Sequence, residues 1–358
     1  MHPHFVELST TLRNEKLLKM EVLFVAQKKH WLFLFNNHLQ SICKKITTLQ
    51  TESTLPAISF LEFTQLYTNI ISRRYVAEIW VYDDKLYLDK NQLYIGEYDL
   101  SFLLIYFDDL WNSLLSARKQ YVGKVTSREI KEYMLKAIPD FLSYFISIVR
   151  FAIRECIDKK PLIDIKKNEE FIVNVGNYMA STESVYAEYK NKDADKIVKW
   201  FEEGHIGDYV YGDYSKLDFS GRSFISKELR YSFFCHSCLK NTFFQGSVLI
   251  GTSFHEASME NCHLDYCFIN EADFSHARLN NASFVNVDGR AGLPNEKEWH
   301  HVGFLPVNFR HADLTNTDFS GAKLQGADFT GAILTGANFT GADLTDAIFD
   351  EDVGEIRT

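Results

Sequence analysis

The sequence predicts an α+β multidomain protein, in which a mainly α-helical N-terminal domain with a small β-hairpin or ribbon precedes a C-terminal solenoid. Two observations predict this division. From Phe309 to Phe349 the chain repeats itself every five residues, which neither the helical nor the strand period explains. The first two hundred residues instead carry apolar residues at helical spacing, with one β-favouring stretch at 79–98.

The N-terminal domain is expected to span residues 1–210. Thr126 followed by Glu129 predicts a capping box at one helix start, and Pro139 predicts the first turn of the next helix. The alternating aromatic and branched residues of 79–98 predict a hairpin or a three-stranded ribbon. The predicted helices cover 5–49, 60–73, 99–121, the segments from 126 and from 139, 182–190 and 193–203.

No catalytic motif stands out in this domain. The sequence contains no glycine-rich phosphate loop, no HExxH and no nucleophile elbow. The acidic pairs at 83–84 and 108–109 fit solvated turn and helix-face residues better than acid and base carboxylates or metal ligands. We therefore predict no catalytic residue, and whether this domain is an enzyme stays open.

The repeat places an apolar residue at every fifth position and a small residue two positions before it, as in "GADFTGAILTGANFTGADLT". Internal periodicity of this kind indicates a solenoid. The repeat centres of the most regular part are Phe309, Leu314, Phe319, Leu324, Phe329, Leu334, Phe339, Leu344 and Phe349.

The same register extends backwards to Phe219, with an interruption at 285–303. The small position is held by Ser, Thr, Cys or Ala between Ser232 and Ala282. We expect the repeat domain to span 211–352 and a short tail to span 353–358.

These residues resemble the pentapeptide repeat family, whose motif is A-(D/N)-(L/F)-x-x. The resemblance implies a right-handed, four-sided β-helix with four repeats, hence twenty residues, in each coil. Each central residue would stack on the one twenty residues further on, at ~4.8 Å. The helical domain would cover the otherwise exposed N-terminal edge, as solenoids require.

The interruption at 285–303 is interpreted as a projecting loop, with a distorted coil as the alternative. Irregular loops on rigid scaffolds often carry function. Trp299 is either part of a binding surface or only fixes the loop to the rod. The candidate binding residues are Glu296, Glu298, Trp299, His300 and His301.

Stacking at twenty-residue intervals places His236, Glu256 and His276 in one outward column. These residue types bind zinc, so a surface Zn²⁺ site is conceivable there, with a metal-free ladder as the alternative. No other cofactor is predicted. Cys262 and Cys267 occupy the small inward position, where cysteine acts as a compact apolar filler.

Composition limits the partners and the compartment. The net charge of −10 argues against nucleic acid as a direct ligand. The apolar segment 141–153 is too short to cross a bilayer, so no membrane association is expected. Six irregularly placed cysteines do not form a disulfide framework, which favours a cytoplasmic location.

The function we expect is that of a non-catalytic scaffold whose solenoid and 285–303 loop bind a protein or peptide. Family resemblance suggests an alternative, an acidic DNA mimic that binds a type II topoisomerase such as gyrase. A third possibility is a peptide-modifying enzyme or maturation partner that acts through the N-terminal domain. The sequence leaves the oligomeric state open.

Overall fold

The computed structural model describes residues 2–83, 92–156, 162, 164–177, 182–190, 194–203, 209–291, 297, 299 and 305–350. The chain forms two compact units. The first combines Met1–Lys190 with the separate segment Asn295–His301. The second combines Asn191–Pro294 with Val302–Thr358.

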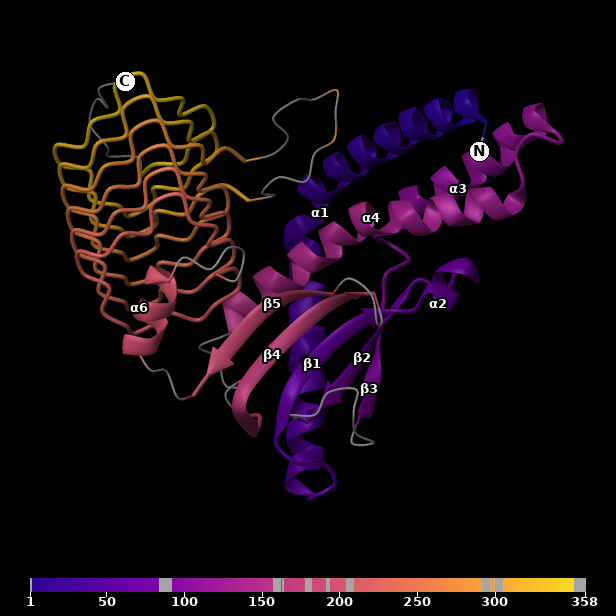
Figure 1. Cartoon of the computed structure of the whole chain (residues 1–358), viewed down its shortest axis with the longest axis horizontal. Coiled ribbons are helices and arrows are strands. Elements are labelled where there is room, and N and C mark those ends of the chain that lie inside the picture. Colours follow the sequence, from indigo (N-terminus) through magenta and orange to yellow (C-terminus); the bar gives the residue numbers. More distant parts are fainter. Residues whose placement is uncertain are drawn as a thin grey trace. The chain divides into compact units, whose positions relative to one another are not determined.

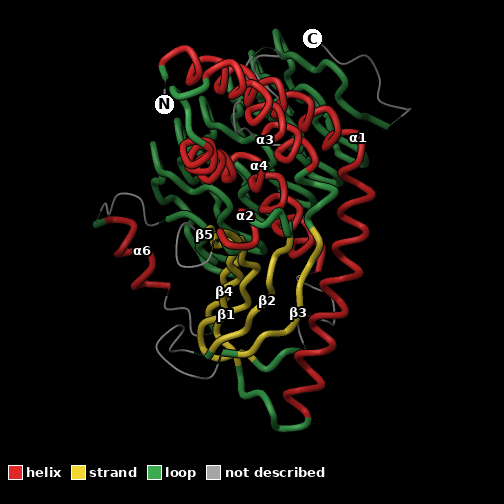
Figure 2. Tube along the Cα trace, turned by 90° about the vertical axis from the view of Figure 1, so that its right-hand side faces the viewer, coloured by secondary structure: helices red, strands yellow, loops and turns green. Residues whose placement is uncertain are grey.

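The first unit contains helices and one five-stranded mixed sheet (Figures 1 and 2). Its strands lie in the order β3-β2-β1-β4-β5, and only β1 and β4 run parallel to each other among these neighbours. The helices are α1 (Pro3–Thr51), α2 (Tyr67–Ile71), α3 (Ile105–Ala117), the 3₁₀ helix η2 (Arg118–Tyr121) and α4 (Ser127–Cys156). The strands are β1 (Ile58–Gln65), β2 (Val76–Tyr82), β3 (Leu93–Asp99), β4 (Lys167–Asn177) and β5 (Thr182–Tyr189).

The two faces of the central strand β1 differ in chemistry. Phe63 packs against Phe35 of α1 and Phe145 of α4, with ring centroids 5.5 and 6.4 Å apart. On the opposite face Glu62, although only 1% exposed, accepts a hydrogen bond of 3.1 Å from the side-chain amide of Asn174. Alternation along β1 therefore places Leu61 and Phe63 on the face toward the helices and Glu62 on the other face.

The capping box at the start of α4 is confirmed. The carboxylate of Glu129 accepts hydrogen bonds from the backbone N–H and the hydroxyl of Thr126, and the Glu129 N–H donates to that hydroxyl. The predicted second helix start at Pro139 is wrong, since α4 continues through this residue. Apolar residues on both sides of Pro139, among them Met134 and Phe141, are fully buried. Their burial outweighs the roughly 3 kcal/mol that an interior proline costs a helix.

Two predicted helices are strands in the structure. The segment 60–73 forms most of β1 and then the short helix α2, and 182–190 forms β5. Both segments are rich in branched and aromatic residues and pair with neighbours on the sheet, so tertiary pairing overrides a weak local helical pattern. The predicted hairpin at 79–98 is present as the antiparallel pair β2 and β3, within a larger sheet than the sequence indicated.

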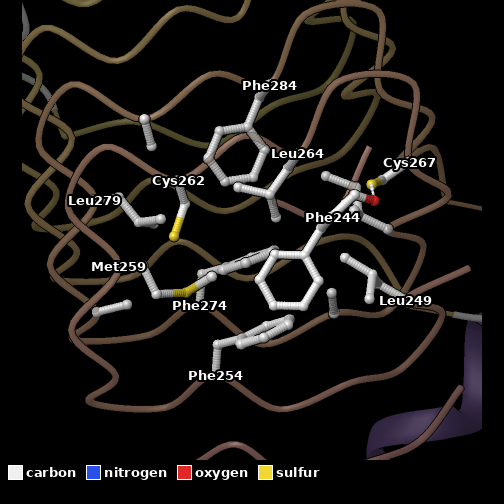
Figure 3. Packing of buried hydrophobic residues seen from close by; sticks show 14 of the residues in the cluster. Phe244, Leu249, Phe254, Met259, Cys262, Leu264, Cys267, Phe274, Leu279 and Phe284 are labelled. Atoms are coloured by element: carbon white, nitrogen blue, oxygen red, sulfur yellow. Dashed lines mark hydrogen bonds between the residues drawn. The ribbon is translucent and has the colours of Figure 1, made fainter. Parts of the chain in front are cut away.

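The second unit is a β-helix in which each coil pairs with the next through isolated parallel bridges. Bridged residues are twenty apart, as in Phe233 with Ser253 and Ser253 with Asp273. Figure 1 shows the coils as a stack of loops, and Figure 3 shows the central side chains gathered inside it. The rings of Phe254 and Phe274 stack at 5.0 Å with 7° between their planes. The predicted four-repeat coil and its stacked interior are confirmed.

The small inward position contains a ladder of buried hydroxyls. The hydroxyls of Ser232, Ser237 and Thr252 each donate to the carbonyl oxygen 23 residues earlier. Cys262 and Cys267 occupy the same position, with 0% and 1% exposure, and their thiols contact the equivalent carbonyl oxygens at 2.8 and 3.0 Å. Burial raises the pKa of both thiols to about 12. Their prediction as compact apolar fillers matches this placement.

The N-terminal end of the solenoid core is covered by helix α6 (Ala194–Glu202), which belongs to the second unit. Phe201 of this helix stacks on Tyr209 at 4.5 Å and contacts the ring of Phe224 at 4.9 Å. The sequence assigned α6 to the N-terminal domain with a boundary at 210, whereas the structure divides the units between Lys190 and Asn191. Phe201 explains the difference, because it extends the stack of aromatic residues inside the coils.

Candidate functional site

The interruption of the repeats is an insertion into one coil. The bridge from Asp273 leads to Asn308 and the bridge from Asp288 leads to Lys323, so bridged residues are 35 apart here instead of twenty. The difference, 35 − 20, leaves fifteen extra residues between Asp288 and Asn308. Residues 285–291, which the sequence placed in the interruption, stay in the coil: the Ala291 N–H still donates to the Gln325 carbonyl at 3.2 Å.

Polar contacts fix the two ends of the insertion to the coil. Arg290 pairs with Asp288 through two contacts of 3.0 and 2.7 Å, and its carbonyl accepts from the Asn270 amide at 2.8 Å. At the returning end the carboxylate of Glu271, only 4% exposed, accepts the backbone N–H of Leu305 at 3.1 Å. The insertion therefore leaves and rejoins the solenoid at one corner.

Trp299, the central residue of the predicted binding loop, belongs to the first unit together with Lys297. Its backbone N–H donates to Oδ1 of Asn14 at 2.9 Å, and Nδ2 of the same amide donates to the Lys297 carbonyl at 2.9 Å. The indole Nε1 donates to the hydroxyl of Tyr144 at 2.7 Å. That hydroxyl in turn donates to Glu21 at 2.8 Å. Trp299 is thus seated on α1 and α4.

The receiving groups are buried. Tyr144 is 0% exposed and packs on Phe24 with ring centroids 5.0 Å apart. Burial raises the pKa of the Tyr144 phenol well above its ordinary value, and the nearby carboxylate of Glu21 adds to this shift. The indole of Trp299 lies 6.4 Å from the Tyr144 ring. The phenol therefore stays protonated, with its proton directed at Glu21 and a lone pair directed at the indole.

The other candidates from the loop, Glu296, Glu298, His300 and His301, lie outside the described residues. Sequence reasoning missed Asn14, Glu21 and Tyr144. Tyr144 lies within the apolar segment 141–153, and a hydroxyl inside such a segment is a signal that a polar partner is needed.

A corner of the solenoid holds the predicted metal-ligand column. Glu256 lies 3.1 Å from Nδ1 of His236 and 3.4 Å from Nε2 of His255. His276 instead stacks on His311 at 4.8 Å, a neighbour that the twenty-residue rule missed because the insertion adds fifteen residues to this coil. In the part of the chain that the structure describes, no three His, Cys, Asp or Glu side chains are arranged to hold a metal ion. Glu256 thus pairs with His236, and His276 stacks on His311; a zinc site at His236, Glu256 and His276 stays a prediction.

An aromatic patch lies on the outside of the early coils. We define the patch as Phe243, Val248, His263, Tyr266 and Phe268. Phe243 and Phe268 are 37% and 49% exposed, and Tyr266 is 63% exposed. Phe243 stacks on His263 in one column at 5.1 Å, Phe268 lies beside Val248 in the next column, and Tyr266 stands at the corner between the columns. Adjacent exposed apolar side chains of this kind mark interaction surfaces.

The first unit also has a surface cleft of about 430 Å³ near the start of β4. Two of its polar side chains, Asn168 and Lys190, hold neighbouring segments together. The Asn168 amide donates to the Ala57 carbonyl and the Ser59 hydroxyl, and the Lys190 ammonium donates to the Lys167 carbonyl. This cleft adds no catalytic arrangement to the candidates.

The repeats match a known family. The model described as pentapeptide repeats matches eight copies over residues 234–265 and 312–350. These two segments are pentapeptide repeats. No curated protein matches the chain. The described helices include none long and apolar enough to cross a membrane.

Several solved pentapeptide repeat structures are similar to the chain. HetL, from the cyanobacterium Nostoc sp. strain PCC 7120 and involved in heterocyst differentiation, is 15% identical, with 46% of this chain and 100% of that chain covered and a TM-score of 0.14. QnrB1, a plasmid-mediated fluoroquinolone resistance protein, is 15% identical over 38% and 70%, with a TM-score of 0.19. A thylakoid lumen protein of Arabidopsis thaliana is 26% identical over 39% and 70%, with a TM-score of 0.17. At these scores the likenesses carry no argument about function.

Proposed function

We propose that the protein is a non-catalytic scaffold that binds a protein partner on its pentapeptide repeats. The aromatic patch is the observation that carries this proposal. Central Phe and Leu residues are buried as the repeat requires, whereas Phe243, Tyr266 and Phe268 occupy outward positions where the repeat needs no apolar residue. Aromatic residues exposed together are the usual anchors of protein interfaces.

The scaffold supplies rigidity to this surface. The backbone around the patch is tied to the next coil, as in the hydrogen bonds from Phe244 N–H to the His263 carbonyl at 2.7 Å and from Leu249 N–H to the Phe268 carbonyl at 2.8 Å. Side chains held on such a frame lose little backbone freedom when they bind. We therefore place the partner site on these coils, with the predicted loop residues as a separate element.

The gyrase alternative has no specific observation in its favour. Most acidic side chains of the regular coils stabilise their own turns: Asp318, Asp328 and Asp343 each accept the backbone N–H two residues further on. This local role accounts for their spacing without a DNA-like charge pattern. No specific observation favours the enzyme alternative either.

A cytoplasmic location belongs to the same proposal. Among the described cysteines, five are free thiols: Cys43, Cys235, Cys238, Cys262 and Cys267. Reduced thiols are the rule in the cytoplasm, and disulfides are the rule in secreted proteins.

The test compares a variant of the patch with a control variant that loses exposed apolar side chains elsewhere on the coils. The patch variant combines Phe243→Ser, Tyr266→Asn and Phe268→Ser, where asparagine suits the positive φ of 59° at position 266. The control combines Ile333→Ser and Ile348→Ser, which are each 52% exposed elsewhere on the coils. Affinity capture from the source cell, followed by identification of the bound proteins, should lose its main partner with the patch variant alone. Equal capture by both variants refutes the patch as the binding surface.

A further inference from the structure

Helix α1 carries apolar side chains on two opposite sides of its middle part. On the inner side Phe24, Trp31 and Phe35 are at most 6% exposed and contact other aromatic rings of the first unit. Val22 and Phe33 stand two positions before Phe24 and Phe35, which turns them about 200° away around the helix. These two side chains are 72% and 62% exposed. A surface helix normally has one apolar side, so the second side of α1 is available for a partner.

The exposed residues of this second side form a continuous stripe. We define the outer stripe as Val22, Val25, Ala26, Lys29 and Phe33. Val25 is 50% exposed, and Ala26 and Lys29 are exposed as well. The steps from Val22 through Ala26 and Lys29 to Phe33 are four, three and four residues, which keeps these side chains on one side of a helix. Helices that pack along each other use this spacing at their seam. The outer stripe therefore has the layout of a helix-pairing surface.

Charge determines which kind of helix fits the outer stripe. Lys29 stands among apolar side chains and forms no ion pair with the residues that the structure describes. Lys19, one turn before the stripe, is instead paired with Glu15 at 2.7 Å. From Val22 to its end at Thr51, α1 contains four lysines and neither Asp nor Glu. A partner helix that covers Lys29 must supply an anionic acceptor, because a buried ammonium without one is costly.

We propose that the outer stripe docks an amphipathic helix of a partner protein, in which a Glu or Asp interrupts the apolar residues opposite Lys29. A second copy of the chain fits less well. Parallel stripes would place Lys29 against Lys29, and the antiparallel arrangement that pairs Phe33 with Val22 places Lys29 against Ala26. A lipid surface also fits less well, since helices that bind one keep their lysines on the polar side. This site is separate from the aromatic patch and does not rest on the scaffold proposal.

The experiment titrates fluorescein-labelled synthetic helices into the full-length protein. Each peptide has about three heptads with Leu at the a and d positions, and only its central a position is varied. The peptide with Glu at that position should bind at least about tenfold more tightly than the peptide with Lys, because like charges that face each other are unfavourable. Lys29→Glu should invert this preference. An inverted preference assigns the contact to the ammonium of Lys29, whereas general apolar attraction would leave both peptides equal.

Matched substitutions connect the binding to the outer stripe. Val22→Ser and Phe33→Ser should each weaken binding of the Glu peptide by about tenfold, because apolar contact area is lost. Val122→Ser is the control, since it makes the same change at a valine that is 83% exposed outside α1 and should leave binding unchanged. All three positions are exposed, so the variants should keep their fold.

Four results would overturn the proposal. The Glu and Lys peptides could bind equally, Lys29→Glu could leave the preference unchanged, Val22→Ser could bind like the natural protein, or neither peptide could bind at about 1 mM. Two other results would assign a different occupant and overturn it as well. A dimer in light scattering that Val22→Ser abolishes identifies a second copy of the chain. Binding to phosphatidylserine vesicles that Val22→Ser abolishes identifies a lipid surface.

Discussion

Phe309 stacks on Phe274 at 5.1 Å with 9° between the ring planes, although the two residues are 35 positions apart. Phe274 stacks on Phe254, twenty positions earlier, with nearly the same geometry of 5.0 Å and 7°. The coil geometry is therefore unaffected by the fifteen extra residues. The stacking of the central rings therefore does not depend on the insertion.

Deletion of residues 292–306 should leave the solenoid folded. The deletion joins Ala291 to Val307 and restores a spacing of twenty between the residues that flank it. Val307 is fully buried at the small position and keeps its place two residues before Phe309. Circular dichroism and the urea midpoint of the solenoid transition check this result, with a drop of less than about 2 kcal/mol expected for the lost Leu305 contact and the new turn. Loss of the cooperative transition would show that the insertion is needed for folding.

The regular repeats could be predicted from the sequence because their physics is local and redundant. Each central Phe or Leu is buried inside the coils like its neighbours in the repeat, so a single irregular residue does not hide the five-residue pattern. The insertion length could not be predicted, because both 20 and 35 are multiples of five and preserve the register of the repeat. His311 was missed as the neighbour of His276 for this reason.

The first unit was harder to predict, because its sheet depends on distant pairing. β1 takes its place in the centre of the sheet from pairs with β2 and with β4, more than a hundred residues later. No local pattern contains that information. The seat of Trp299 was missed for a similar reason. Asn14 and Tyr144 are unremarkable positions of two helices until the fold brings them to the same segment.

Truncation of one central phenylalanine should destabilise the solenoid strongly. Phe254 is 0% exposed and contacts the rings of Phe234, Phe244 and Phe274 at 5.4, 5.7 and 5.0 Å. Phe254→Ala should cost about 3–5 kcal/mol, the typical cost of a buried cavity of this size. The urea midpoint measures the change.

The matched control for this truncation is Phe243→Ala. Phe243 is 37% exposed on the outward side of the coil. Its truncation should change the stability by less than about 1 kcal/mol. If the two variants are destabilised equally, the division between inward and outward positions is wrong.

Cys262 should resist thiol reagents in the native protein. The residue is 0% exposed, and burial raises the pKa of its thiol to about 12, so the reactive thiolate is scarce at pH 8. Cys262→Ala should not reduce the fast thiol reaction of the native protein with a disulfide reagent, but should reduce the total by one thiol in urea. Ala282 stands at the same position one coil later, so alanine is compatible with the fold. A smaller fast phase in the variant would place the thiol at the surface.

His38 should make the first unit less stable in mild acid. This side chain of α1 lies against Tyr98, with ring centroids 4.9 Å apart, and its Nε2 has no hydrogen-bond partner among the described residues. Burial lowers the pKa of His38 below its ordinary value. The unfolded chain then takes up a proton near pH 6.5 that the folded protein does not, so stability falls as the pH decreases through that range.

Substitution of His38 should reduce the loss of stability that the first unit shows in mild acid. His38→Gln removes the titrating group, so its melting temperature should decline less between pH 7.5 and pH 5.5 than that of the natural protein, by about 2 °C. His4→Gln is the control, because the His4 side chain is 78% exposed and its substitution should leave the pH profile parallel to that of the natural protein. A His38→Gln profile that also runs parallel would show that the imidazole is protonated as easily in the folded protein as in the unfolded chain.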